Sequence, residues 1–200
     1  MNPHETGAVN APSINLQPFC ASQNDFRDWM RTPFRMNGKS YASNGHILIE
    51  TEGGDHPDIP AIMIQRITDI LASLPTAGYQ ALPVIPAPKF RPCRTCTGRG
   101  DKPTCPACVG HGKFKHYDDW YDCKPCDGKG HFNDPCQDCN ATGQIDTSRP
   151  VRVGIARFQR NYLSLIAQLP TPLLATGSMP DDIAGFTFHG GRGALMPLKS

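Results

Sequence analysis

The sequence predicts an α+β protein in which one small domain, built from both ends of the chain, is interrupted by a cysteine-rich arm. Eight of the nine cysteines lie between Cys93 and Gly143. On either side of this segment, apolar residues alternate as in strands or recur at helical spacing. Neither flank alone has enough elements for a stable domain, so residues 15–85 and 148–200 are expected to pack together around residues 86–147.

The first flank begins with a polar segment, residues 1–14, which we expect to be flexible. A short helix is predicted next, because Phe26, Trp29 and Met30 recur at helical spacing. A Ser-x-x-Asp capping box that starts at Ser22 precedes these residues and would begin the helix.

A β-hairpin and a longer helix are predicted to follow. Turn signals at Asn37-Gly38 and Asn44-Gly45 bracket KSYAS and precede HILIE, a pattern typical of paired strands. Asp58 is expected to cap the helix. The apolar stripe of this helix consists of Ile59, Ile62, Met63, Ile67, Ile70, Leu71 and Leu74. Residues 81–92 are rich in proline and read as an extended linker into the arm.

The second flank repeats the mixture of strand and helix signals. SRPVRVGIA alternates like a strand, and the chain closes with IAGFTF and GALMPLKS around a His-Gly-Gly turn at 189–191, which predicts a terminal hairpin. Between them lies a second amphipathic stripe that Pro170 ends. It consists of Phe158, Tyr162, Leu165, Ile166 and Leu169.

The arm contains four C-x-x-C pairs, each followed closely by glycine: CRTCTGRG, CPACVGHG, CKPCDGKG and CQDCNATG. A C-x-x-C turn supplies two thiolates on one small loop, and a tetrahedral zinc site needs four ligands. The glycines suit tight turns that require positive φ. Four pairs therefore predict two structural Zn²⁺ ions, with no coordination position left open for catalysis.

Two other uses of the cysteines are weaker. A disulfide framework is typical of small secreted proteins, but the chain starts with MNPHETGAVN and shows no signal peptide. A thiol-disulfide oxidoreductase usually has one C-x-x-C pair near a βαβ pattern. Reduced, metal-bound cysteines favour a cytoplasmic location. Cys20, outside the arm, is expected to be a small buried apolar residue.

The repeats resemble the C-x-x-C-x-G-x-G pattern of the cysteine-rich zinc-binding domain of DnaJ-type co-chaperones, over residues 89–147. Only the fourth repeat departs from the pattern, with Ala141 in place of its first glycine. The resemblance implies a V-shaped β-hairpin in which the outer pairs share one zinc ion and the inner pairs the other. It implies a first site of Cys93, Cys96, Cys136 and Cys139. It implies a second site of Cys105, Cys108, Cys123 and Cys126. Spacing alone leaves open the other pairing, first with second and third with fourth.

The rest of the chain does not follow that family. His56-Pro57-Asp58 spells the tripeptide of the J-domain, but it follows a strand-like stretch where a J-domain has a helix. Only some 50 residues follow the arm, too few for the long C-terminal domains of the family. We therefore expect a DnaJ-type zinc module placed in a different protein, of a size that would suit a phage or mobile element.

Charge gives little support for a nucleic-acid partner of the arm. The formal net charge is +2, and eight thiolates with two Zn²⁺ would bring the loaded protein near −2. Residues 89–117 are basic and residues 118–139 are acidic. A folded hairpin would set these halves side by side, whereas nucleic-acid binding needs a contiguous basic face. The sequence leaves a nucleic-acid partner open but does not favour one.

A protein partner is favoured instead. The segment KFKHYDDWYD (113–122) lies between the inner pairs, at the expected tip of the arm. Its aromatic residues are candidate partner-binding residues if exposed, and the alternative is that they pack onto the zinc turns or onto the α+β domain. These candidates are Phe114, Tyr117, Trp120 and Tyr121. No catalytic motif and no apolar run of transmembrane length are present. We expect a non-enzymatic, chaperone-like or regulatory adaptor, whose oligomeric state the sequence does not address.

The flanks also resemble, more weakly, one domain of a DNA-polymerase sliding clamp. The resemblance lies in the order of helix, NGKSYASNGHILIE hairpin, helix, VRVGIARFQRNYLSLIAQLP and a final strand that contains Met-Pro. It implies a duplicated βαβββ unit and, as the alternative function, a DNA-associated protein whose zinc arm contacts nucleic acid. No catalytic or ligand motif accompanies this likeness.

Overall fold

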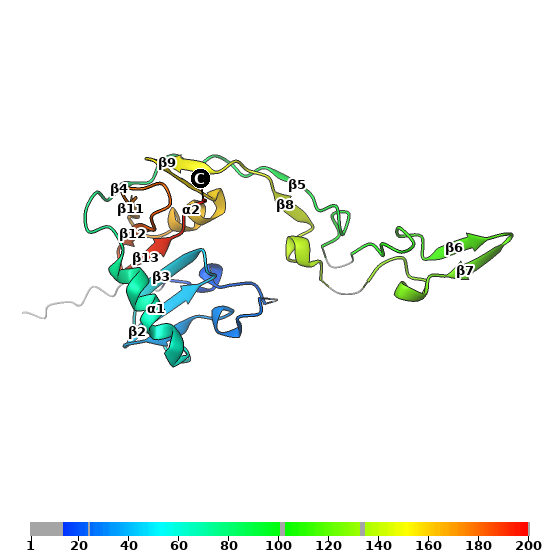
Figure 1. Cartoon of the computed structure of the whole chain (residues 1–200), viewed down its shortest axis with the longest axis horizontal. Coiled ribbons are helices and arrows are strands. Elements are labelled where there is room, and N and C mark those ends of the chain that lie inside the picture. The colour runs from blue at the N-terminus through cyan, green and yellow to red at the C-terminus, as the bar shows by residue number, and fades with distance from the viewer. Residues whose placement is uncertain (1–13, 24, 101–102, 133–134, 200) are drawn as a thin grey trace, which may run out of the picture. The chain divides into compact units, whose positions relative to one another are not determined.

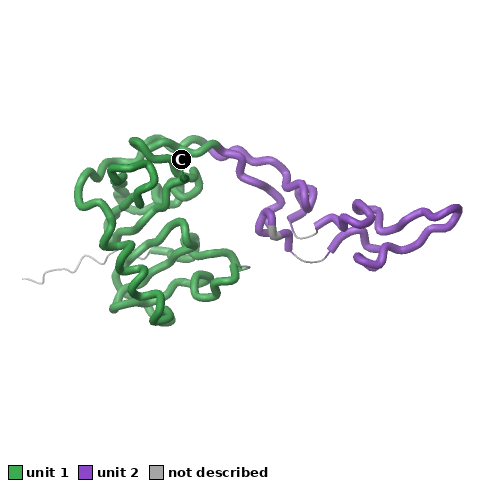
Figure 2. The backbone as a smooth tube through the Cα atoms, in the orientation of Figure 1, with its two compact units in different colours: residues 1–86, 149–200 green, residues 87–148 purple. Residues whose placement is uncertain are grey.

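The computed structural model describes residues 14–23, 25–100, 103–132 and 135–199 of the 200-residue chain. The chain divides into two compact units (Figure 2), namely unit 1, residues 1–86 and 149–200, and unit 2, residues 87–148. The flexible N-terminus predicted for residues 1–14 lies, apart from Ile14, outside the described residues. No helix in the described part of the chain has the length and apolarity needed to cross a membrane.

Unit 1 is built on a seven-stranded antiparallel sheet in the order β1-β2-β3-β13-β12-β11-β4. Its strands are β1 (Phe34–Met36), β2 (Lys39–Ser43), β3 (Ile47–Glu52), β4 (Gln80–Ala81), β11 (Leu173–Ala175), β12 (Ala184–Phe188) and β13 (Gly191–Leu195). β3 and β13 are neighbours at the centre of the sheet (Figure 1), with Ile49 opposite Gly193. Strands from both flanks of the chain therefore belong to one sheet, and the predicted α+β class is confirmed.

Two helices cover opposite faces of this sheet. Successive side chains of a strand point to opposite faces. Ile47 and Ile49 of β3 pack in one core with α2 (Arg160–Ile166), whereas Leu48, between them, packs in a second core with α1 (Ala61–Ala72). The first core also receives the hairpin of β9 (Val151–Val153) and β10 (Ala156–Phe158) and the short 3₁₀ helix Gln17–Phe19. The sheet is thus buried on both faces.

The predicted hairpins of unit 1 are confirmed. Asn37 and Gly38, which connect β1 to β2, both have positive φ, as the type I′ turn of a two-residue hairpin requires. Asn44 and Gly45 lie between β2 and β3, and the terminal hairpin forms between β12 and β13. The sequence did not reveal β1 and β11, which are three residues long.

The helix predicted behind Ser22 is wrong. Only a single 3₁₀ turn, Asp28–Met30, forms there, and the side chain of Phe26 is 87% exposed. The Asp25 carboxylate accepts hydrogen bonds from the backbone N–H and the guanidinium of Arg27. This local turn satisfies the polar groups that a helix start would otherwise use.

The predicted helix cap at Asp58 is also wrong. α1 begins at Ala61, after Pro60, and no side chain caps it. The Asp58 carboxylate instead pairs with the Arg35 guanidinium at 3.0 Å, and the two residues form a parallel bridge beside the sheet. The His-Pro-Asp tripeptide therefore lies on a loop between β3 and α1.

Two further expectations need correction. Residues 81–92 were expected to form an unpaired, extended linker. Both ends of this segment instead belong to paired strands, because Gln80–Ala81 forms β4 and Phe90–Pro92 forms β5 of unit 2. Phe158 belongs to β10 and not to the helix, whose buried positions are Leu163 and Ile166.

In its described residues, unit 2 contains two small ladders and the turns that carry the cysteines. β5 (Phe90–Pro92) pairs with β8 (Gln144–Asp146), which joins the two ends of the unit. β6 (Lys113–His116) pairs with β7 (Asp119–Asp122), which forms the hairpin in the middle of the segment. Short 3₁₀ turns at Lys124–Cys126 and Gln137–Cys139 carry cysteines. Because so little of this unit is regular or apolar, its fold depends on the cysteine clusters.

Candidate metal centres

The structure gathers the eight cysteines of the arm into two groups of four. The outer cluster consists of Cys93, Cys96, Cys136 and Cys139. The inner cluster consists of Cys105, Cys108, Cys123 and Cys126. All four sulfur atoms of each cluster lie within 4.8 Å of one another, and all eight residues are buried. The pairing of first with second and third with fourth, which spacing left open, does not occur.

The sulfur spacing fits zinc. In the outer cluster the Sγ atoms of Cys93 and Cys136 are 3.8 Å apart, and those of Cys96 and Cys139 are 3.7 Å apart. Zinc binds thiolate sulfur at about 2.3 Å, which places two tetrahedral ligands about 3.8 Å from each other. The corresponding distances in the inner cluster are both 3.8 Å. Each cluster could therefore hold one zinc ion, and the structure provides for two Zn²⁺.

The same distances exclude disulfides. A disulfide places its sulfur atoms about 2.0 Å apart. All nine cysteines, including buried Cys20 of unit 1, are free thiols. Burial raises the pKa of the Cys20 thiol to about 11, which keeps it protonated and unreactive. The expectation that Cys20 is a small buried apolar residue agrees with its place in the first core.

Each turn also directs a backbone N–H at a sulfur atom. In all four repeats the second glycine donates to the second cysteine of its own repeat, with an N···S distance of 3.2 Å. The four donors are Gly100, Gly112, Gly130 and Gly143. Hydrogen bonds to sulfur favour the thiolate, the form that binds metal.

The two turns of a cluster interlock through their backbones. In the outer cluster Cys93 donates its N–H to the Gly143 carbonyl at 2.8 Å, and Cys136 donates to the Gly100 carbonyl at 2.7 Å. Cys105 and Gly130 form the same bond in the inner cluster, as do Cys123 and Gly112. Backbone hydrogen bonds therefore join the two repeats of each cluster, in addition to any metal ion that the cluster holds.

Only glycine fits the second glycine position of each repeat. A Cβ atom on Gly100 would overlap the carbonyl oxygen of Ala141, and φ there is +72°. Gly143, its counterpart in the partner turn, faces the carbonyl oxygen of Gly98 in the same way. At the first glycine position, by contrast, a Cβ on Gly98 would meet nothing closer than 3.7 Å.

This contrast explains the one departure from the repeat pattern. Ala141 occupies the first glycine position of the fourth repeat, and it adopts φ 63° together with Asn140 at φ 48°. The turn thus keeps the shape of the others and accepts the backbone strain of an alanine in the left-handed region. The substitution leaves both ligands of the fourth pair in place.

The thiols of each cluster differ in acidity. Backbone N–H groups of Cys96 and Thr95 lower the pKa of Cys93 to about 7. Burial and neighbouring thiols raise the pKa of Cys136 to about 12. In the inner cluster burial alone would raise the pKa of Cys108, but the Gly112 N–H and the neighbouring thiols together lower it to about 7. Zinc needs the thiolate form, so metal uptake should release protons and weaken at low pH.

No histidine belongs to either cluster among the described residues. His131 forms an isolated β-bridge with Thr104 and precedes Phe132, which packs on the inner cluster. Its Nδ1 atom is buried and has no hydrogen-bond partner in the described structure. His111 and His116 are exposed. Four cysteines complete a tetrahedral ligand set in each cluster, so neither cluster needs a histidine ligand.

The predicted partner-binding residues lie together on the β6–β7 hairpin and are exposed. Phe114 stands opposite Tyr121 in the ladder, Trp120 is opposite Lys115, and Tyr117 lies in the turn. Their exposed fractions range from 43% for Phe114 to 86% for Tyr117. The alternative, that they pack onto the zinc turns, does not hold for these side chains.

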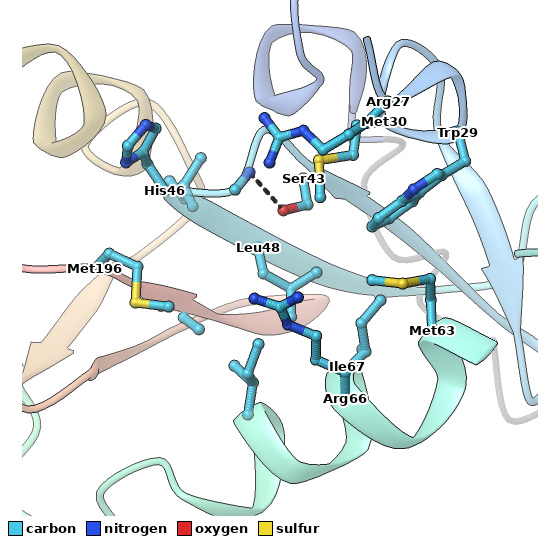
Figure 3. Close-up of a pocket in the computed structure, with 14 residues that line it drawn as sticks. Arg27, Trp29, Met30, Ser43, His46, Leu48, Met63, Arg66, Ile67 and Met196 are labelled. Atoms are coloured by element: carbon cyan, nitrogen blue, oxygen red, sulfur yellow. Dashed lines mark hydrogen bonds between the residues drawn. The ribbon is translucent and has the colours of Figure 1, made fainter. Parts of the chain in front are cut away.

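Unit 1 contains an apolar cavity that no sequence motif indicated (Figure 3). Its volume is about 270 Å³, and Trp29, Met63 and Met196 line it together with Arg27 and Arg66. Arg27 is paired with Asp25 at 2.8 Å. Periodicity in the sequence identifies apolar faces but not the gap between them, which depends on how α1, β3 and the 3₁₀ turn meet.

Comparisons with known proteins find several chaperone proteins DnaJ that are similar to part of this chain. The chain is 33% identical over 93 residues to a chaperone protein DnaJ of Nitrosomonas europaea, covering 42% of this chain and 25% of that protein. It is 32% identical over 81 residues to DnaJ of Paramagnetospirillum magneticum, covering 36% and 21%. It is 35% identical over 74 residues to DnaJ of Psychrobacter arcticus, covering 32% and 20%.

The chain thus spans about a fifth to a quarter of the length of the curated relatives it matches. No family model matches the chain. No solved structure matches it significantly. The similarity to several DnaJ proteins and the two four-cysteine clusters together identify a DnaJ-type cysteine-rich zinc-binding domain within this chain.

Proposed function

We propose that this protein is a non-enzymatic adaptor that binds a protein partner through the tip of its zinc-stabilised arm. The observation that carries the proposal is the β6–β7 hairpin, whose eight strand residues are all exposed although four of the ten hairpin residues are aromatic. Exposed aromatic side chains grouped on a rigid support are typical interaction anchors.

The aromatic residues are arranged by the ladder. Phe114 and Tyr121 are directly opposite and lie on one face, and His116 lies on that face because it is two residues from Phe114. The His116 ring contacts Tyr121 edge-on at 6.4 Å. The other face carries the Lys113–Asp122 pair at 3.7 Å, and Trp120 lies on it beside Lys115. We infer that the aromatic face contacts the partner and that the charged face stays in water.

Tyr117 supports this assignment through its backbone. Its φ is 54°, a conformation that bulky residues rarely adopt, and its side chain is 86% exposed. Such strain costs about 1–2 kcal/mol. The only ring near the tyrosine in the described structure is that of His116, at 4.6 Å. Tyr117 makes few stabilising contacts within the fold that could offset this strain. We infer that its side chain contacts another molecule.

The two zinc ions would supply the rigidity that this surface needs. The hydrophobic clusters of unit 2 consist of cysteines with one apolar neighbour each, Ile145 for the outer and Phe132 for the inner. Metal binding would provide the free energy that such a segment cannot gain by burying apolar surface. The relatives are named as chaperones, which supports a chaperone-like role and an extended polypeptide as the partner.

Further parts of the proposal concern context. We propose that residues 15–85 and 148–200 form one discontinuous domain that presents the arm, that the protein is cytoplasmic, and that it is phage-encoded. The sliding-clamp-like alternative gains no support from the fold, because the first flank orders its elements as three strands, α1 and β4. That order is not the βαβββ unit implied by the resemblance to a sliding clamp.

The test measures binding of the zinc-loaded protein to fluorescently labelled, reduced and carboxymethylated α-lactalbumin, a polypeptide that cannot fold. Phe114→Ala and Tyr121→Ala, on the aromatic face, should each weaken binding about tenfold, as for an interface anchor worth about 1.4 kcal/mol. Phe26→Ala is the matched control, since it removes an exposed aromatic side chain from unit 1. Zinc content should stay at two per chain in all variants. Equal binding by the hairpin variants and wild type would refute the proposal.

A further inference from the structure

The β9–β10 hairpin of unit 1 presents two arginines that face each other. In its antiparallel ladder Arg152 is directly opposite Arg157. Both side chains are exposed, whereas Ala156 and Phe158 of the same hairpin are buried in the first core. Like charges directly opposite each other in a ladder destabilise it. The hairpin therefore keeps a charge arrangement that its own folding does not favour.

In the part of the chain that the structure describes, no carboxylate pairs with these two arginines. The chain from 147 to 180 contains no Asp or Glu and four arginines. Among the described residues, no ion pair involves Arg149, Arg152, Arg157 or Lys199. The guanidinium groups of the hairpin bond only to backbone carbonyls, Arg152 to Gly154 and Arg157 to Lys199, each at 3.3 Å.

Other arginines of unit 1 behave differently. Arg27, Arg31, Arg35 and Arg192 each pair with a carboxylate at 2.8–3.1 Å. The hairpin arginines thus differ from these four arginines, because no carboxylate of the described residues is paired with them. The bond from Arg157 to the Lys199 carbonyl brings the segment that follows β13 beside the hairpin and adds a fourth cation, the exposed Lys199 itself.

We propose that Arg152, Arg157 and Lys199, together with Arg149 two residues before β9, bind the phosphate backbone of a nucleic acid. Guanidinium groups match phosphate oxygens with paired N–H donors, and three of the four cations are arginines. A phosphate backbone supplies closely spaced negative charge, so it can neutralise opposed arginines together. Contacts of this kind position a protein on nucleic acid without reading sequence.

The proposal places the contact on unit 1 and not on the zinc arm. On the arm, Lys113 is paired with Asp122, and acidic residues of β7 lie beside the basic residues of β6. A phosphate approaching that hairpin would meet both signs of charge. The sequence analysis considered nucleic-acid contact by the zinc arm. The proposed contact lies instead on the β9–β10 hairpin of unit 1.

The salt dependence of binding provides a quantitative expectation. Four phosphate contacts predict a slope of log K against log salt of about −3.6 for duplex DNA. Between 50 and 200 mM salt, binding should then weaken about 150-fold. Replacing two of the four cations should reduce the slope to about −1.8 and the weakening to about 12-fold.

The experiment measures fluorescence anisotropy of a labelled 20-base-pair duplex with the zinc-loaded full chain from 50 to 200 mM NaCl. The test variant is Arg152→Gln with Arg157→Gln, and circular dichroism and zinc content check its fold. Arg35→Gln is the control on unit 1, since Arg35 is paired with Asp58. Lys113→Gln with Lys115→Gln is the control on the arm. The proposal expects the halved slope only in the hairpin variant.

Three results would overturn it: no duplex binding at 50 mM, a wild-type slope in the hairpin variant, or an equal loss in the arm variant. Vesicles with 30% phosphatidylserine are included, and binding to these but not to the duplex would assign the surface to membranes instead. Binding to unfolded α-lactalbumin is measured on the same samples, so that failure of the adaptor proposal is seen separately.

Discussion

Loss of the outer cluster should destabilise unit 1, whereas loss of the inner cluster should leave unit 1 almost unchanged. Unit 1 holds the chain on both sides of the arm, because Ile85 and Val151 pack in the same core and Arg160 donates to the Pro86 carbonyl at 2.6 Å. Folding of unit 1 therefore closes a loop formed by unit 2, residues 87–148. A crosslink inside that loop shortens it and lowers the entropy lost on folding.

The magnitude follows from the positions of the clusters. Without metal the loop has about 62 residues, and zinc in the outer cluster leaves a path of about 15, through 87–92 and 140–148. If only the inner cluster holds zinc, the path is about 40 residues. Loop-closure entropy then predicts a loss of about 0.9 kcal/mol without the outer cluster and about 1.3 kcal/mol without both. Loss of the inner cluster alone does not change the shortest path.

The assay follows urea unfolding of unit 1 by the fluorescence of Trp29, which packs edge-on against Phe34 with the ring centres 5.4 Å apart. Trp120→Phe removes the second tryptophan, which lies on the arm. In this background, Cys93→Ser with Cys136→Ser is compared with Cys105→Ser with Cys123→Ser. The reasoning would be refuted by equal destabilisation in the two variants, or by no change when the outer cluster is lost.

Two further predictions concern the repeats and the buried carboxylate. Gly100→Ala should weaken zinc binding by about 10²–10³-fold, because strain and a displaced N–H···S bond together cost about 3–4 kcal/mol; Gly98→Ala, where a Cβ has room, should cost only about fivefold. Competition with a chromogenic zinc chelator measures both, and similar losses would contradict the interlocked-turn geometry. Glu50 of β3 is 5% exposed and bonds to Lys39 at 2.9 Å and Arg192 at 3.1 Å. Burial by itself raises the pKa of Glu50, but hydrogen bonds from Lys39, Arg192 and Tyr41 outweigh it and lower the pKa. Its stabilisation is therefore complete above the ordinary value of 4.5 and is lost as pH falls through the lower folded value. Glu50→Gln should destabilise unit 1 by about 2 kcal/mol at pH 7, and denaturant titrations should show the difference from wild type shrinking in acid; a constant difference across pH would contradict this.

The sequence alone determined the chemistry of the arm. Two thiolates on one turn follow directly from C-x-x-C, and the glycines mark backbone that must adopt positive φ. These are local properties, so the eight ligands and the two zinc ions could be read without knowing the fold. The same holds for the β2–β3 hairpin, because Asn44-Gly45 specifies its turn within four residues.

Local signals misled where a distant partner decided. The capping box predicted at Ser22 does not form, because Asp25 binds Arg27 instead. Asp58 does not cap α1, because its carboxylate binds Arg35, which is 23 positions away. Both carboxylates found a guanidinium that offers a charge-assisted bond in place of a helix N-terminus. Apolar residues at helical spacing do not show whether a nearby carboxylate will bind an arginine or cap a helix.

Only the tertiary structure decided which cysteine pairs meet and which charges remain unpaired. Spacing is equally compatible with both pairings of the four repeats, and the choice depends on backbone bonds such as that from Cys93 to Gly143 across the arm. Likewise, Arg152 and Arg157 become a pair only because β9 and β10 align them. Ligand type is a property of the residue, whereas pairing is a property of chain segments brought together over distance, and for that reason it required the fold.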